Sequence, residues 1–281
     1  MPMPVQVRYY TDPACSWSWG SEPKLRRLLW EFGEELRFTW VMGGLARSCG
    51  SERYWELVTE WLDVSDESGM PIDGRLWSQN PIASTYPACQ AVKAAAEQGS
   101  EPAYRYLRRL REGLMTERKK LDHPEALIGE AGVAGLDTER FRIDLASNAI
   151  TEAFAADLEA TRAPPTEARE EGKVGETEGH DRVSFPSAVF RGEDGPERGV
   201  WGWSAYEEYR EAAIAAGAQP TQALPSDPAD PIRRFGRCTT RELEELTGKP
   251  GPVLRAELWS LAREWRLKPV RVLGGTFWEL A

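Results

Sequence analysis

The residues best suited to chemistry lie together in one short stretch, residues 12–20, which read DPACSWSWG. Cys15 falls between a predicted strand and a predicted helix. At such a junction the free backbone N–H groups and the helix dipole stabilise a thiolate. The position therefore predicts a lowered thiol pKa and a nucleophile that acts near neutral pH. The structural alternative is that Cys15 is a small buried apolar residue at a strand-to-helix turn.

The elements that must position Cys15 are a strand, a helix and a second strand. Residues 5–10 (VQVRYY) are β-branched and aromatic, which is typical of a strand. A helix is predicted from an N-cap at Ser21 to Gly33, because Pro23 suits a first turn and apolar residues recur at helical spacing. Residues 36–42 (LRFTWVM) predict the second strand. This β-α-β order implies a parallel pair of strands.

A block of helices is predicted to follow, and then a second group of strands. Residues 51–181 carry repeated helical patterns and end in a polar stretch at 163–181, which has almost no apolar content and predicts a mobile loop. Residues 182–191 and 198–203 predict an antiparallel hairpin, and 204–217 a helix.

This order of elements predicts an α/β chain with a thioredoxin-like fold. Residues 1–50 and 182–217 would form the thioredoxin-like domain, and residues 51–181 would be a helical domain inserted between its halves. The proline-rich segment 218–231 predicts a linker.

The last 50 residues have a pattern of their own. Thr239 and Glu242 have the spacing of a capping box, and Gly274-Gly275 suits a tight hairpin turn. Two helices and a hairpin predict a small winged-helix-like module over residues 232–281. Residues 231–281 hold ten Lys and Arg against six Asp and Glu. A basic module of this kind could contact DNA, but its helices mix both charges, so docking on the body or a protein contact is the favoured interpretation.

Composition excludes several classes of function. The chain of 281 residues has a net charge of −10, which argues against nucleic acid or an anionic membrane as a partner of the whole protein. Its four cysteines, including Cys49, Cys89 and Cys238, are too scattered for a disulfide scaffold or a zinc site. We expect no bound metal. The N-terminus has no secretory pattern and no stretch is long and apolar enough to span a membrane, so a cytoplasmic protein is expected.

Four segments resemble the FrnE-like proteins of the DsbA family. Residues 12–20 are similar to the family motif D-P-x-C-x-W-C-x-G, and residues 183–190 (VSFPSAVF) to its G-F-P-[ST] segment. Residues 84–95 (STYPACQAVKAA) and 121–145 also match, in the same order. The resemblance covers residues 4–217 and implies a thioredoxin fold with a redox-active cysteine.

The resemblance also implies roles for individual residues. Cys15 would be the attacking thiol, and Ser18 stands where the family has its resolving cysteine. Ser18 can donate a hydrogen bond to a thiolate but cannot close a disulfide, so an external thiol, or Cys49 if it lies close, would have to resolve a mixed disulfide. Phe185-Pro186 would carry the family's cis-proline beside the thiol and bind substrate. The alternative is an edge-strand proline.

Trp17 and Trp19 flank the thiol and are candidates for an apolar substrate-binding surface. Ordinary core packing is the equally weighted alternative for both rings.

Three functions follow from these features. The first is a thiol-disulfide oxidoreductase with a C-x-x-S site, acting on a protein disulfide or a small-molecule thiol. It would hold no bound cofactor, although glutathione or another low-molecular-weight thiol could serve as its partner. The second is a glutathione-dependent isomerase or transferase of the kappa-class type, which would use Ser18. The third is a non-enzymatic DsbA-like adaptor that delivers a regulator to a protease.

Overall fold

A four-stranded sheet forms the centre of the body. The computed structural model describes residues 3–193 and 195–281. The strands β1 (Val5–Thr11), β2 (Leu36–Met42), β5 (Ser187–Arg191) and β6 (Arg198–Val200) lie in the order β2-β1-β5-β6. β1 and β2 are parallel, as predicted, and pair in register from Val5 with Leu36 to Thr11 with Met42. β5 is antiparallel to both β1 and β6, so the predicted hairpin is also present.

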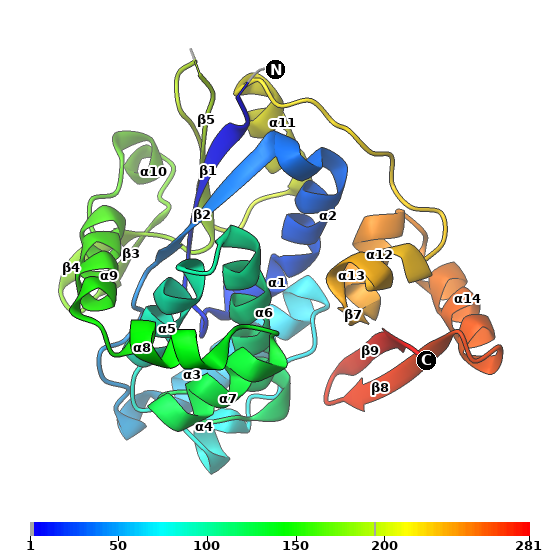
Figure 1. Ribbon diagram of the computed structural model, residues 1–281, viewed down its shortest axis with the longest axis horizontal. Helices are drawn as coiled ribbons and strands as arrows, with labels where there is room; N and C mark the ends of the chain where they lie inside the picture. The colour runs from blue at the N-terminus through cyan, green and yellow to red at the C-terminus, as the bar shows by residue number, and fades with distance from the viewer. Residues whose placement is uncertain (1–2, 194) are drawn as a thin grey trace.

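Helices cover both faces and one edge of this sheet (Figure 1). The connection from β1 to β2 contains α1 (Ser16–Gly20), α2 (Glu22–Phe32) and a 3-10 turn at Gly33–Glu35. Ser21 is the N-cap residue of α2, as predicted, although its side chain makes no capping hydrogen bond. α1 is an extra turn of helix that the periodicity of the sequence did not indicate. α11 (Tyr206–Ala215) packs on α2 and β6.

The inserted helices begin with a 3-10 turn at Ser51–Arg53 and cover the β2 edge of the sheet. They are α3 (Tyr54–Ser68), α4 (Leu76–Gln79), α5 (Tyr86–Ala96), α6 (Ser100–Glu117), α7 (Pro124–Val133), α8 (Thr138–Leu145) and α9 (Asn148–Thr161). The outer edge of β2 is capped by side chains from these helices. Ser100 donates to the carbonyl of Phe38 at 2.6 Å, and Asp157 accepts from the amide of Met42 at 2.8 Å.

The polar segment 163–181 is not the loop that its composition predicts. It contains α10 (Thr166–Glu170) and most of a hairpin formed by β3 (Val174–Thr177) and β4 (His180–Val183). Two residues with positive φ, Glu178 and Gly179, close that hairpin at +55° and +77°. A few buried anchors, among them Ala168 and Val183, are enough to fix the segment on the body.

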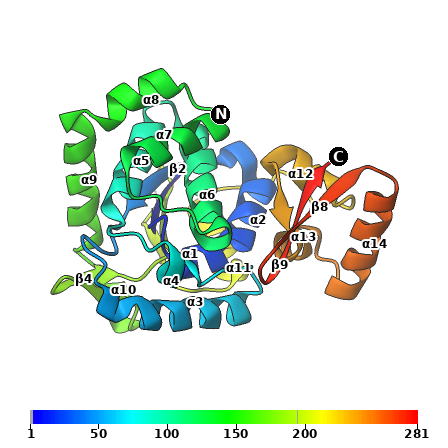
Figure 2. The same ribbon diagram turned by 90° about the horizontal axis from the view of Figure 1, so that it is seen from below.

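The C-terminal module lies beside α2 and stands to the right of the body in both ribbon views (Figures 1 and 2). It contains α12 (Ala229–Phe235), β7 (Cys238–Thr239), α13 (Thr240–Thr247), α14 (Gly251–Arg263), β8 (Leu267–Val272) and β9 (Gly275–Leu280). Its strands lie in the order β7-β9-β8. α12 starts at Ala229, inside the segment predicted as linker, so only residues 218–228 of that segment connect the two parts. The winged-helix assignment of the module stays a prediction.

Buried charges join the module to the body. Glu242, on α13, lies 3.1 Å from Arg26 of α2 and 2.5 Å from Arg108 of α6. The exposed fraction of each of these side chains is 5% or less. Glu242 also accepts from the amide of Thr239 at 2.6 Å, which completes the predicted capping box. One carboxylate thus begins a helix of the module and neutralises two arginines of the body.

Candidate functional site

Cys15 follows β1 after three residues and is the N-cap residue of α1. Its Sγ accepts a hydrogen bond from the backbone N–H of Ser18 at 3.3 Å, so the sulfur takes the place of a capping oxygen. The predicted position at a helix N-terminus is therefore what the structure has. The side chain is only 6% exposed.

The environment of the thiol differs from the sequence expectation. Burial raises the pKa of Cys15 above its ordinary value, while hydrogen bonds from Ser18 and the positive charge of Arg182 lower it and Asp12 raises it. The loss of hydration is the largest of these effects, so the helix N-terminus does not give a low-pKa thiol in this conformation. The expectation of a lowered pKa was wrong because it considered the helix end without what covers it.

The Phe185-Pro186 segment lies against the thiol. Its peptide bond is cis, and the Cys15 thiol donates to the carbonyl of Phe185 at 3.9 Å. Pro186 directly precedes β5, which lies between β1 and β6. The edge-strand interpretation of this proline therefore does not hold. The backbone of Phe185, whose side chain is buried, is thus beside the sulfur, although the two residues are 170 positions apart.

Ser18 is completely buried and faces the interior. Its Oγ accepts from the Thr11 hydroxyl at 2.8 Å, and its amide donates to the Cys15 sulfur. Neighbouring Asp12 is also buried, and its carboxylate accepts from the amides of Ala14 and Leu45 at 2.8 Å each. Burial raises the pKa of this carboxyl group. Asp12 and Ser18, which lie before and after Cys15 in the motif, are therefore held by hydrogen bonds to buried neighbours.

The other cysteines do not bond to Cys15. Within the described part of the chain, all four cysteines are free thiols. Cys49 is partly exposed, and burial raises its pKa to about 11. Cys89 donates to Asp12 at 3.2 Å and is fully buried. Cys238 is buried between the module and Arg26, and burial raises its pKa to about 12.

The two tryptophans of the motif have different environments. Trp17 is partly exposed and its ring packs on Trp203, with centroids 5.2 Å apart. Trp19 is 0% exposed, donates to the carbonyl of Pro71 at 2.9 Å and packs on Phe277 of the module. The substrate-binding prediction for Trp19 was therefore wrong, because successive rotations along α1 turn its ring into the core. Trp17 can still contact a bound molecule.

A small apolar cluster covers the thiol. Cys15 packs with Ala168 of α10, in the stretch predicted as a loop, with Val183 of β4, and with Trp201. Arg182 of β4 places its guanidinium 4.6 Å from the centre of the Phe185 ring. Sequence reasoning missed Arg182, which begins the predicted strand 182–191, because no local pattern there indicated that it lies near the thiol.

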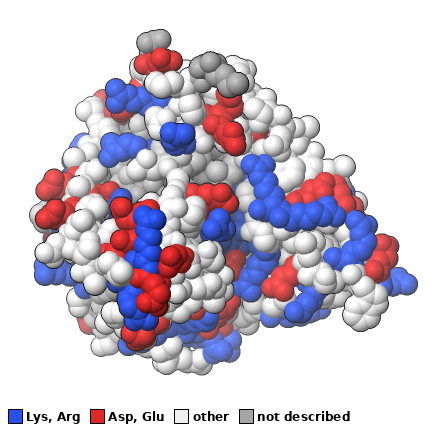
Figure 3. Space-filling view, in the orientation of Figure 1, with Lys and Arg blue, Asp and Glu red and all other residues white. Residues whose placement is uncertain are grey.

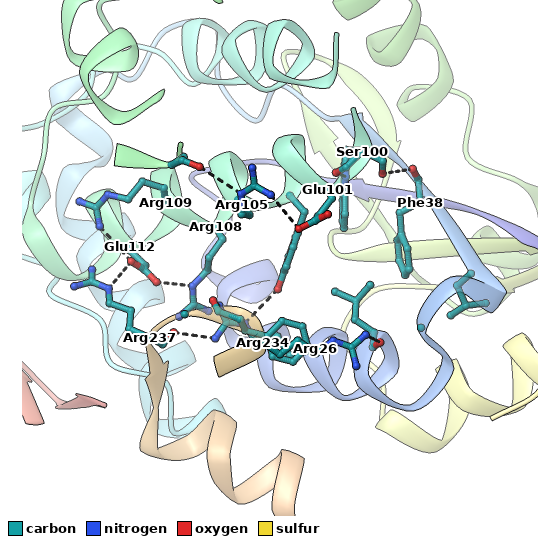
Figure 4. Close-up of a pocket in the computed structure, with 18 of the residues that line it drawn as sticks. Arg26, Phe38, Ser100, Glu101, Arg105, Arg108, Arg109, Glu112, Arg234 and Arg237 are labelled. Atoms are coloured by element: carbon teal, nitrogen blue, oxygen red, sulfur yellow. Dashed lines mark hydrogen bonds and ion pairs between the residues drawn. The ribbon is translucent and has the colours of Figure 1, made fainter. Parts of the chain in front are cut away.

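A separate hollow lies at the junction of the body and the module. It has a volume of about 1230 Å³, and Cys15 is not among its lining residues. Figure 4 shows Arg105, Arg108, Arg109, Arg234 and Arg237 around it, with Glu112 bound between several of them. In Figure 3 Lys and Arg side chains gather at this junction. Most of these arginines already have carboxylate partners, some within α6 and one, Arg237 with Glu112, across the junction of the module and the body.

Among the residues that the structure describes there is neither a cluster of metal ligands nor a helix that could cross a membrane. In residues 3–193 and 195–281, no three His, Cys, Asp or Glu side chains are grouped so that they could hold a metal ion. Over the same ranges, every helix is too short or too polar to cross a lipid bilayer.

Comparisons with known proteins place this geometry in context. A chain from Halalkalibacterium halodurans, the ClpXP adapter protein SpxH, is 32% identical over 167 residues, which are 57% of this chain and 55% of that relative. The chain thus spans about half the length of that relative in this match. The SpxH adapter of Bacillus subtilis is 24% identical and aligns with 98% of this chain and 89% of its own length.

Solved structures show the same fold. The cytosolic disulfide reductase DsbM from Pseudomonas aeruginosa superimposes with a TM-score of 0.56 at 17% identity, over 74% of this chain and 98% of its own. A provisionally assigned protein disulfide isomerase from Nitrosomonas europaea gives a TM-score of 0.61 at 18% identity, over 75% and 96%. A family model described as Thioredoxin matches residues 9–164, more than half of the 281 residues. The chain therefore belongs to this thioredoxin family.

Proposed function

We propose that this protein is an adaptor that binds a client protein and presents it to a protease of the ClpXP type. The observation that carries the proposal is the state of the thiol. Cys15 is 6% exposed, burial raises its pKa, and Ser18 occupies the position of a resolving cysteine. The site therefore keeps the thioredoxin scaffold but has lost two requirements of rapid disulfide turnover, an accessible thiolate and a second thiol.

The extent of the relatives supports the same proposal. The SpxH adapter of Bacillus subtilis aligns with 98% of this chain, whereas the disulfide reductase DsbM covers 74% of it. The whole chain, with its docked C-terminal module, thus has its counterpart among adapters. Adaptor activity needs surfaces rather than a reactive group, and the buried charges around Glu242 hold two parts of the surface in a fixed relation. We place this activity in the cytoplasm.

Degradation measurements test this proposal. Proteins whose half-lives lengthen when the gene is deleted are candidate clients, and each purified candidate is then incubated with ClpXP with or without this protein. We expect at least one client to be degraded about ten times faster with the wild-type protein. Cys15→Ser should accelerate degradation equally, because binding does not need the thiol. If no client depends on the protein, or if Cys15→Ser removes all acceleration, the adaptor proposal is wrong.

Thiol-disulfide exchange through Cys15 alone is a second candidate, favoured by the hydrogen bonds from Ser18 to the sulfur. In the first step the Cys15 thiolate attacks a disulfide R–S–S–R, forming a mixed disulfide and releasing R–S⁻. In the second step an external thiolate attacks that mixed disulfide, restoring Cys15 as thiolate and forming a new disulfide. Glutathione, another low-molecular-weight thiol or a protein thiol could supply this reductant.

Mass spectrometry tests the exchange. Incubation with oxidised glutathione should add one glutathionyl group to Cys15, and reduction should remove it. Cys15→Ser should lose the adduct, while Cys49→Ser, which removes the partly exposed thiol, should retain it. The kappa-class alternative predicts a different result, namely a glutathione-dependent activity that persists in Cys15→Ser. The buried hydroxyl of Ser18 does not favour that alternative, because Thr11 already bonds to it.

A further inference from the structure

Ser18 is the only residue of the motif that donates to the sulfur in the described structure, and its hydroxyl is held by residues outside the motif. The Thr11 side chain, at the end of β1, contacts Ser18 Oγ at 2.8 Å. Arg111, on α6, in turn contacts Thr11 Oγ1 through its Nη2. Thr11, Ser18 and Arg111 are each 0% exposed, so no water competes for these bonds.

Arg111 determines which group donates and which accepts in each hydrogen bond of this series. An arginine can only donate, so Thr11 Oγ1 must accept from Arg111. The single proton of Thr11 is then available to Ser18, whose Oγ accepts it. The Ser18 proton is thereby left free for the Cys15 sulfur, which already accepts from the amide of the same residue at 3.3 Å. A series of three donors therefore leads from a guanidinium toward the thiol.

Arg111 is itself anchored firmly. Its Nη1 lies 2.6 Å from a carboxylate oxygen of Glu22, on α2, and Tyr104 donates to the other oxygen of Glu22 at 2.6 Å. Positive charges around Glu22, that of Arg111 foremost, hold the pKa of its carboxyl below the usual range although burial acts to raise it. The series of donors thus begins at a buried ion pair between α6 and α2.

We propose that Thr11 and Arg111 are positioning residues that keep the Ser18 hydroxyl directed at Cys15 Sγ and so stabilise its thiolate. The proposal rests on the thiol exchange proposed above. The buried charge of Arg111, far from residues 12–20 in sequence, would thereby act on the thiol. Burial disfavours the thiolate, and an oriented neutral donor offsets part of this cost without adding a charge to the site.

Several charged or titratable groups also face this region and must stay unchanged in any test. Asp12 lies on the same turn and opposes the thiolate, while Arg182 of β4 favours it. Tyr9 of β1 and Glu60 of α3 face the same region, and Glu60 accepts from Ser16 Oγ at 3.1 Å. Replacing Thr11 by Val removes one hydroxyl of nearly the same shape and leaves all these charges in place.

The test is the pH dependence of Cys15 alkylation by iodoacetamide in five full-length proteins that share a Cys49→Ser background. They are the parent, its Thr11→Val, Thr11→Ser and Ser18→Ala variants, and the double variant with both Thr11→Val and Ser18→Ala. Losing one oriented donor should raise the Cys15 pKa in Thr11→Val and slow alkylation about three- to tenfold at fixed pH below that pKa. Thr11→Ser retains the hydroxyl and should match the parent. Thr11→Val added to Ser18→Ala should have no further effect, because Thr11 acts through Ser18.

The outcomes separate this inference from the function on which it rests. If Cys15 reacts in the parent and the pH profile of its alkylation is the same in Thr11→Val, the positioning role alone is overturned. An effect of Thr11→Val that persists fully in Ser18→Ala also overturns it. A native parent in which Cys15 never reacts overturns both this role and thiol exchange. Should Thr11→Val fail to fold, Thr11→Ala serves for the same comparison, because it removes the hydroxyl without adding bulk.

Discussion

Trp265 combines two features that proteins usually avoid, and its replacement by glycine gives a sharp test of the structure. The side chain is 86% exposed, and its backbone has a φ of +57°. It follows α14, where its amide donates to Ala262 and the next amide, that of Arg266, donates to Leu261 at 3.0 Å. These bonds end the helix in the way that normally requires glycine.

The expected gain can be worked from this geometry. The left-handed conformation costs a residue with a Cβ roughly 1–2 kcal/mol. Glycine avoids that cost but loses about 0.4–1 kcal/mol through its greater freedom in the unfolded chain. An indole that is 86% exposed contributes little burial. Trp265→Gly should therefore stabilise the protein by about 0.5–1 kcal/mol, which corresponds to a Tm increase of about 1–4 °C for a chain of this size.

Calorimetry or thermal circular dichroism measures this change, with Trp265→Ala as the matched control. Alanine removes the ring but keeps the Cβ, so it should show none of the gain. A Trp265→Gly protein that is less stable than wild type would mean that the indole makes contacts that the structure does not show. An equal gain in Trp265→Ala would mean that the ring, rather than the backbone, is the source of strain.

Three further outcomes are expected. Arg182→Gln removes the positive charge that lowers the pKa of Cys15, so iodoacetamide should react more slowly with Cys15 near neutral pH, and an unchanged rate would show that the charge does not reach the sulfur. Glu242→Gln removes the carboxylate that two buried guanidinium groups share and leaves Arg26 without its ion pair, although Arg108 keeps Glu112; it should cost about 3–5 kcal/mol in urea unfolding, and a loss below 1 kcal/mol would contradict the buried pairing. Burial raises the pKa of Cys89 and Cys238, so as the pH rises the unfolded chain loses these thiol protons before the folded protein does. The two buried thiols should therefore contribute fully to the free energy of unfolding below about pH 8.5, and this contribution should decrease as the pH rises toward 12. Unfolding free energies that stay constant over that interval would refute this expectation.

Local patterns in the sequence were sufficient for the elements around the candidate site. The alternation in VQVRYY and LRFTWVM predicts strands that the structure has at Val5–Thr11 and Leu36–Met42. The spacing of Thr239 and Glu242 predicts a capping box that is present. Each of these signals depends on residues within one or two turns of each other, where sequence spacing translates directly into geometry.

The environment of Cys15 could not be derived in the same way. Its pKa depends on Phe185, Val183 and Ala168, which reach the sulfur only after the chain has folded back over more than 150 positions. The family resemblance indicated Phe185-Pro186, but α10 and most of the β3–β4 hairpin come from a stretch whose polar composition predicts a loop. Buried Ala168 within that stretch, buried Val183 just after it and a turn at Gly179 outweigh that composition. Burial therefore decides a property that the helix position alone predicted with the wrong sign.

The shared charge cluster limits how this chain can be recombined with others. Glu242 belongs to the module, and its partners Arg26 and Arg108 belong to the body. Grafting the module onto a foreign thioredoxin-like scaffold would bury Glu242 without these guanidinium groups, and removing the module would leave Arg26 and Arg108 without Glu242 in the body that remains. A fusion or swap would succeed only if all three residues travelled together. The module therefore cannot be exchanged between proteins without matched changes on both sides of the junction.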